Sequence, residues 1–144
     1  KMPEKTAEVI ELIDGYRWYR TGDKGHLDED GFLTIVDRYS RFAKIGGEMI
    51  SLTTVEEEIL DACNDKDLEI AATCLPDQRK GEKIVLIATN NLDKNNLKKL
   101  LSDAKVNPLY HPAEVLIVEE IPKLGSGKTD FGATKKIALV NEQK

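Results

Sequence analysis

The chain has 144 residues, of which 40% are hydrophobic and 33% are charged, as in one compact globular domain or a domain with part of another attached. Its formal net charge of −5 argues against a nucleic-acid partner, whose phosphates are met by basic surfaces. No apolar run approaches the roughly 20 residues of a membrane-spanning helix, and the N-terminal residues lack a signal-peptide pattern.

The two cysteines, Cys63 and Cys74, are isolated, with no CxxC motif and no histidine at ligand spacing. We therefore expect both thiols to be reduced and buried in a cytosolic protein, and we predict no metal site. We assign no catalytic or metal-binding role to His26 or His111.

In chain order, the first predicted element is a pair of short strands within residues 25–38. Asp30-Gly31 supplies the positive φ of a tight turn between them. A basic, then glycine-rich, then apolar segment follows at residues 40–52. The stretch TTVEEEILDACND then predicts a helix, with Thr53 or Thr54 as N-cap and Glu56 or Glu57 completing a capping box.

The second half of the chain alternates strands and helices. Residues 68–77 and 82–91 are apolar, β-branched runs typical of strands, and residues 94–104 have the leucine spacing of an amphipathic helix. A third strand is predicted around residues 115–118, and a final helix follows Asp130, its expected cap. This order predicts a small α+β domain with a β-hairpin and a three-stranded core sheet packed by helices.

The segment GSGKT invites comparison with a phosphate-binding P-loop. A Walker A loop needs G-x-x-x-x-G-K-[ST], so a glycine would have to stand five residues before Gly127. That residue is Pro122, which has no amide hydrogen to donate. We therefore reject the P-loop interpretation, and the role of Lys128 stays open at this point.

Three motifs in order carry a resemblance. YRTGD (residues 19–23), GFLTIVDRYSRFAKIGGEMISLTTVEEEI (31–59) and PKLGSGK (122–128) resemble the last motifs of the adenylate-forming superfamily. That superfamily includes acyl-CoA synthetases, luciferases and peptide-synthetase adenylation domains. RFAKIGGEMISL and LGSGKTDF are most similar to the acyl-[acyl-carrier-protein] synthetases that are joined to a 2-acylglycerophosphoethanolamine acyltransferase.

The resemblance implies a nucleotide site and a hinge. Asp23 matches the family aspartate that accepts hydrogen bonds from both ribose hydroxyls, and Arg38 matches an arginine that also contacts the ribose. The family has a glycine before that arginine, whereas this chain has Asp37, a departure that could change the local turn. Ser40 stands at the position about which the C-terminal domain rotates in the family.

The resemblance also implies two chemical roles. Lys128 matches the lysine that sits between the carboxylate and the α-phosphate of ATP, where negative charge builds up. Lys44, Gly46 and Gly47 match the segment that lines the tunnel for the pantetheine arm once the domain has rotated. Glu56 matches a family glutamate, although helix capping explains it equally well. As a separate hypothesis, Arg41 would help to dock an acidic carrier protein.

We accordingly expect residues 1–39 to be the tail of the N-terminal adenylation domain and residues 40–144 to be the mobile C-terminal domain. The expected reaction activates a fatty acid with ATP and transfers it to the phosphopantetheine thiol of acyl carrier protein, supporting lysophospholipid reacylation. The large N-terminal domain would bind Mg²⁺ and make most of the contacts to ATP, so this chain alone would be inactive. We expect the parent to lie at the cytoplasmic face of a bacterial inner membrane.

Two alternatives remain. An acyl-CoA ligase would share every motif and use coenzyme A as the acceptor, and only AKIGGEMIS distinguishes the two, weakly. A non-catalytic interaction domain would have kept the fold and lost the catalytic residues. The presence of Asp23, Arg38 and Lys128 together argues against this alternative.

Overall fold

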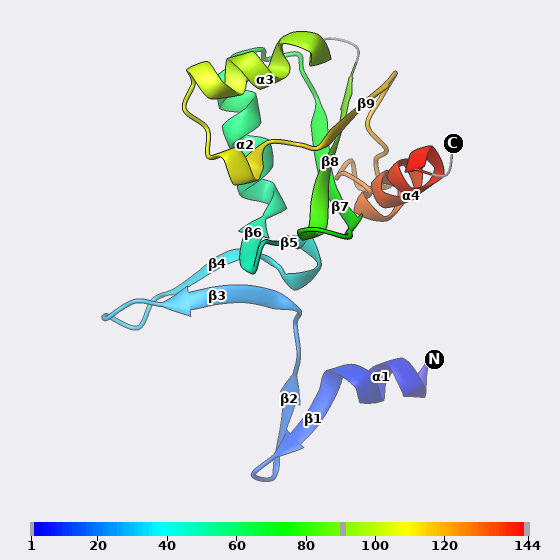
Figure 1. Cartoon of the computed structure of the whole chain (residues 1–144). Coiled ribbons are helices and arrows are strands. Elements are labelled where there is room, and N and C mark those ends of the chain that lie inside the picture. The colour runs from blue at the N-terminus through cyan, green and yellow to red at the C-terminus, as the bar shows by residue number, and fades with distance from the viewer. Residues whose placement is uncertain (1, 90–91, 143–144) are drawn as a thin grey trace. The chain divides into compact units, whose positions relative to one another are not determined.

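The computed structural model describes residues 2–89 and 92–142 (Figure 1). The chain divides into two compact units, residues 1–40 and residues 41–144. No helix within these described residues is long and apolar enough to cross a membrane.

The first unit contains a helix and two separate β-hairpins. Helix α1 (Pro3–Val9) leads into β1 (Ile10–Ile13) and β2 (Tyr16–Tyr19), which pair antiparallel. This hairpin was not predicted from the sequence, although Asp14 and Gly15 both take positive φ in its two-residue turn, as a type I′ turn requires. The predicted hairpin around Asp30-Gly31 is confirmed as β3 (Asp23–Leu27) and β4 (Leu33–Arg38).

The second unit is built on one five-stranded sheet. The predicted strands are confirmed as β7 (Ile70–Asp77), β8 (Gly81–Thr89) and β9 (Glu114–Val118). The segment after Ser40 adds two more, β5 (Phe42–Ile45) and β6 (Glu48–Ser51), so the sheet order is β6-β5-β8-β7, with β9 parallel to β8. The three-stranded prediction missed β5 and β6 because Gly46 and Gly47 were not interpreted as the turn of a hairpin.

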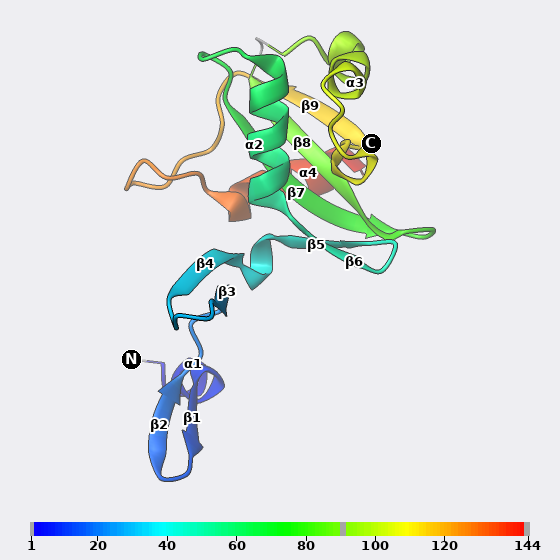
Figure 2. The same ribbon diagram turned by 90° about the vertical axis from the view of Figure 1, so that its left-hand side faces the viewer.

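Helices cover both faces of this sheet. Helices α2 (Leu52–Cys63) and α3 (Lys94–Asp103) lie on one face and α4 (Phe131–Glu142) on the other (Figure 2). Alternate residues of β8 therefore enter different cores: Leu86 packs with the α2 side and Ile87 with the α4 side, and both are 0% exposed. Burial on both faces explains why β7 and β8 are continuously apolar instead of alternating.

The predicted cap of α2 is wrong. The N-cap is Ser51, whose side chain accepts a hydrogen bond from the Thr54 amide. Glu56 is therefore not part of a capping box, and its carboxylate is used elsewhere. For α4, the Asp130 carboxylate does accept the Ala133 amide, at 2.9 Å, as expected of a cap.

Candidate functional site

Asp23 and Arg38 lie side by side in the first unit. They are partners at one end of the β3–β4 hairpin, and Arg38 Nε lies 3.1 Å from Asp23 Oδ1. The Asp23 side chain is 29% exposed, so its carboxylate stays accessible to a hydroxyl donor despite the ion pair. The two residues predicted to contact the ribose are thus brought together by strand pairing, in a geometry compatible with that role.

Asp37, which replaces the family glycine, lies beside an irregularity of this hairpin. The register shifts between Lys24 and Gly25, whose partners are Asp37 and Ile35, so that Val36 is an extra residue. The Asp37 carboxylate accepts the Arg38 amide at 2.7 Å. A bulge turns the side chains that flank it, so the shift sets the direction in which Arg38 leaves the strand.

Ser40 is the last residue of the first unit and the middle residue of the 3₁₀ turn η1 (Tyr39–Arg41). A single 3₁₀ turn has weaker hydrogen-bond geometry than an α-helix and frequently connects elements. Its role as a hinge stays a prediction.

Lys44, Gly46 and Gly47 form the end of the β5–β6 hairpin. Ile45 pairs with Glu48, and the two glycines between them have φ of 61° and 93°. A type I′ turn needs positive φ at both central positions. No atom lies within 4 Å of a Cβ built on either glycine, so within this unit backbone conformation, not crowding, calls for glycine here.

The turn between β7 and β8 holds this glycine turn in place. The Lys44 amide donates to Glu82 Oε2 at 2.5 Å, and the Gly46 amide donates to the Lys80 carbonyl at 2.9 Å. Lys80 and Glu82, with Lys44, Gly47 and Gly81, line an open pocket. Lys80 and Glu82 were missed in the sequence, where the only local signal was a glycine after a polar turn.

Glu82 also contacts a buried thiol. Cys74 Sγ lies 3.4 Å from Glu82 Oε1. Burial first, and the neighbouring Glu82 carboxylate second, raise the pKa of Cys74 to about 11. The thiol therefore stays protonated near neutral pH. Cys74 is buried as expected, whereas Cys63 is only half-buried, so the prediction that both thiols are buried is wrong for Cys63.

Lys128 lies on an exposed hairpin between β9 and α4. The Leu124 amide donates to the Lys128 carbonyl at 2.7 Å, and the Gly127 amide donates to the Leu124 carbonyl at 2.8 Å. Gly127 has φ of 82°, so residues 125–127 form a three-residue loop that closes with glycine in the left-handed region. This geometry confirms that GSGKT is not a phosphate-binding arch.

The Lys128 hairpin and the Gly46-Gly47 turn lie at opposite ends of β7 (Figure 2). Lys123 of the hairpin pairs with Glu69, just before β7, at 2.7 Å, whereas the glycine turn is held by Lys80 and Glu82, just after β7. An eight-residue strand spans roughly 23 Å. The second unit therefore carries two separate candidate surfaces, which cannot both occupy one small site at the same time.

Arg41 is not available for docking a partner, which contradicts the hypothesis made from its charge. Its side chain is only 6% exposed and pairs with Glu56, Nη2 to Oε2, at 2.6 Å. An arginine buried by its own ion pair cannot present its charge to a carrier protein.

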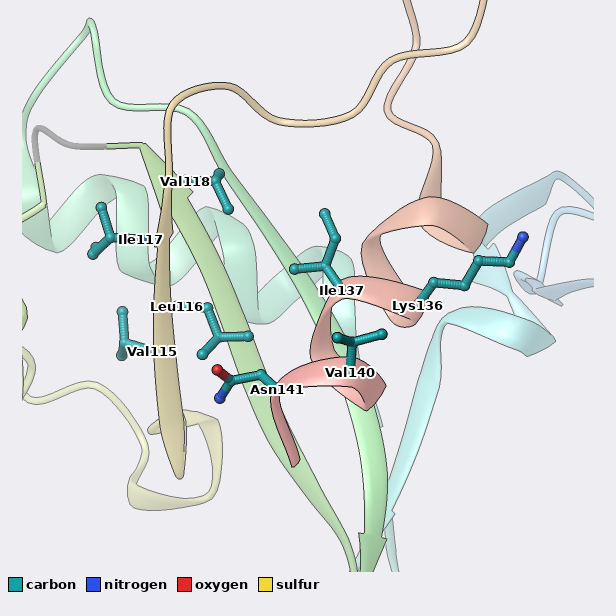
Figure 3. A pocket seen from close by; sticks show the side chains of 8 residues that line it. All are labelled: Val115, Leu116, Ile117, Val118, Lys136, Ile137, Val140 and Asn141. Carbon is teal, nitrogen blue, oxygen red and sulfur yellow. The ribbon is translucent and has the colours of Figure 1, made fainter. Parts of the chain in front are cut away.

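A groove between β9 and α4 holds none of the residues predicted to have a function (Figure 3). Its lining is mainly apolar: Val115, Leu116, Ile117, Val118, Lys136, Ile137, Val140 and Asn141. Within residues 2–89 and 92–142 no group of three His, Cys, Asp or Glu side chains is placed to hold a metal ion.

Comparison with known proteins finds relatives among the CoA ligases. No family model matches the chain. It is 36% identical over 134 residues to the 2-succinylbenzoate–CoA ligase of Listeria monocytogenes, covering 92% of this chain and 28% of that protein. It is 31% identical over 123 residues to the 4-chlorobenzoate–CoA ligase of an Arthrobacter species, covering 84% of this chain and 22% of the ligase.

Solved structures agree. A fatty acyl CoA synthetase of Mycobacterium tuberculosis matches with a TM-score of 0.62 and 27% identity, over 94% of this chain and 26% of that one. ATP-bound MatB of Rhodopseudomonas palustris matches in fold, with a TM-score of 0.73 and 23% identity, over 95% of this chain and 27% of that one. Both of these curated relatives are CoA ligases, and the Mycobacterium protein is a fatty acyl CoA synthetase. Its fold is that of the C-terminal domain of adenylate-forming enzymes, and it spans about a quarter of these proteins' length.

Proposed function

We propose that the chain is the C-terminal part of an ATP-dependent ligase that activates a carboxylic acid as its acyl-adenylate. In the first half-reaction the carboxylate oxygen attacks the α-phosphorus of ATP and pyrophosphate leaves. In the second, a thiol sulfur attacks the acyl carbon and AMP leaves. The observation that carries the proposal is Lys128 on an exposed hairpin at one end of a unit whose other end carries the Gly46-Gly47 turn.

In this proposal Lys128 acts in the first half-reaction. Its ammonium group on a long side chain offsets the negative charge that builds up as the carboxylate meets the phosphate. Asp23 and Arg38 hold the ribose of the nucleotide. Rotation about Ser40 would then withdraw Lys128 from the acyl-adenylate and bring Lys44 and Gly47 to it instead. One movement can do both because the Lys128 hairpin and the Gly46-Gly47 turn lie at opposite ends of β7.

We propose coenzyme A as the thiol acceptor, because the relatives named above are CoA ligases. The names of these relatives cover aromatic acids and fatty acids. We therefore propose that the substrate belongs to the organic carboxylic acids, a class that includes the fatty acids. Acyl carrier protein is a second candidate acceptor, supported only by the resemblance of RFAKIGGEMISL to acyl-carrier-protein synthetases.

The first unit supports a larger parent. Within its described residues many large apolar side chains are exposed, including Tyr16 at 73%, Trp18 at 59% and Phe32 at 70%. So many exposed apolar side chains in about 40 residues favour packing of this unit against another part of a protein. We propose that this unit packs on the remainder of an adenylation domain, which would bind most of the ATP, Mg²⁺ and the acid, so that the chain alone is inactive.

The test is ATP–pyrophosphate exchange by the full-length parent. Lys128→Ala should lower the exchange rate about 10²–10³-fold, as expected for loss of a group that stabilises transition-state charge. Lys98→Ala, which removes an exposed lysine of α3, is the matched control and should exchange like the wild type. Exchange that is unaffected in Lys128→Ala would refute the assigned role. Supplying coenzyme A or holo-carrier protein to the wild type then identifies the acceptor.

A further inference from the structure

Arg41 follows Ser40 directly, and its guanidinium group contacts three elements of the second unit, β7, α2 and α4. Nη1 donates to the Ala72 carbonyl of β7 at 2.9 Å. Nη2 donates to Thr53 and Glu56 of α2, at 3.3 and 2.6 Å. The guanidinium carbon lies 3.7 Å from the centre of the Phe131 ring, at the start of α4.

The polar contacts link Arg41, Glu56 and Ala72 to one another. Glu56 accepts from Arg41 with one carboxylate oxygen and from the Ala72 amide, at 2.6 Å, with the other. Both backbone groups of Ala72, on a strand at the sheet edge, are thus satisfied by this pair. A planar guanidinium can make these directed bonds and stack on a ring at the same time, which an ammonium group cannot.

The stacked ring connects this set to the Lys128 hairpin. Phe131 follows Asp130, whose amide donates to the Pro122 carbonyl at 2.8 Å and so closes the base of the hairpin. Asp130 also caps α4. Guanidinium stacking on Phe131 therefore fixes the point at which the hairpin joins the rest of the unit, immediately beside the segment that follows Ser40.

We propose that Arg41 is a positioning residue for Lys128, acting through Phe131. This inference rests on the proposed role of Lys128 in acyl-adenylate formation. Arg41 holds the base of the hairpin against α2, β7 and the chain after Ser40, so that the ammonium group arrives at the reacting oxygens in one geometry. The Gly46-Gly47 turn is held separately, by Lys80 and Glu82, so the second half-reaction does not depend on this stack.

The decisive variant is Phe131→Leu in the full-length parent, because it removes the ring and leaves the Arg41–Glu56 pair intact. Since small misplacements of a reacting group are costly, the kcat of ATP–pyrophosphate exchange should fall roughly tenfold or more, with the KM for ATP unchanged. Conversion of supplied acyl-adenylate to thioester should stay within about twofold of wild type, because neither Phe131 nor Lys128 is used there. Leu139→Ala is the matched control, since Leu139 is on the same helix and, like Phe131, is 40% exposed.

A second variant, Arg41→Lys, and the reference variant Lys128→Ala distinguish failure of this inference from failure of the proposed function. Arg41→Lys keeps the charge and loses the planar fork, and should show the same selective loss. Equal loss of both half-reactions with a lower unfolding midpoint, or no loss in either, would overturn the inference. Lys128→Ala is measured alongside. If it still exchanges normally, the proposed function fails. If it is inactive while Phe131→Leu is normal, only the role of Arg41 fails.

Discussion

Lys123 and Thr129 face each other across an isolated antiparallel bridge, and the hairpin between them carries Lys128. The amides of Leu124 and Gly127 donate hydrogen bonds to carbonyl groups within this hairpin. They are therefore not arranged around an anion, as the amides of a P-loop are. What Lys128 offers a phosphate is the positive charge of its side chain.

Gly127 should tolerate substitution far less well than Gly125. Gly127 has φ of 82°, where an L-residue is strained by about 1–2 kcal/mol, whereas Gly125 does not take positive φ. Neither position has an atom within 4 Å of a built Cβ, so crowding is equal. We expect Gly127→Ala to slow ATP–pyrophosphate exchange in the parent several-fold and Gly125→Ala to have little effect. Equal rates in the two variants would contradict the loop geometry.

Removal of the Glu82 carboxylate should affect thiol transfer. Glu82→Ala deletes the acceptor for the Lys44 amide, so the Gly46-Gly47 turn loses one of its two attachments to the β7–β8 turn. We expect a several-fold higher KM for the thiol substrate and unchanged ATP–pyrophosphate exchange. Glu82→Gln keeps an acceptor oxygen and should lie much closer to wild type. A loss confined to exchange would show that Glu82 serves the other surface.

The Cys74 thiol should make the protein less stable at alkaline pH. Its folded-state pKa, about 11, is above that of an unfolded cysteine, near 9. The folded state therefore holds the proton more tightly, and this contribution to stability is complete below about pH 9. It is lost as the pH rises toward 11. Urea unfolding at several pH values should show a steeper alkaline loss for wild type than for Cys74→Ala, which lacks the titrating thiol; the packing that this variant loses lowers stability equally at each pH.

Lys83 should anchor the C-terminal end of α4. Its ammonium group lies 2.6 Å from Glu114 of β9 and 2.9 Å from Glu142 of α4, and hydrogen bonds to these two carboxylates raise its pKa. Lys83→Met leaves the two acidic groups facing each other without a cation. We expect a loss of about 1 kcal/mol in the free energy of unfolding, measured by urea denaturation. Lys98→Met, which replaces an exposed lysine of α3, is the control and should leave the free energy of unfolding unchanged.

Local patterns were sufficient for most of the second unit. The leucine spacing of α3 buries Leu97 and Leu101, and the apolar runs of β7 and β8 form strands covered on both faces. Turn chemistry was also informative at Asp30-Gly31, but it was overlooked at Asp14-Gly15 and undervalued at Gly46-Gly47. The errors at α2 arose because Ser51, Thr53 and Thr54 are all competent caps, and only the actual chain path selects Ser51.

The sequence by itself determined the β3–β4 hairpin, the helices and the strands β7, β8 and β9 of the second unit, and the exclusion of a P-loop, because these depend on neighbours a few positions apart. Only the tertiary structure decided that Arg41 is buried beneath Phe131, that Glu82 holds Lys44, and that the two candidate surfaces lie at opposite ends of β7. Arg41 and Ala72 are 31 residues apart, and Lys44 and Glu82 are 38 apart. Contacts over such distances depend on how the helices pack on the sheet, which no local pattern of charge or hydrophobicity specifies.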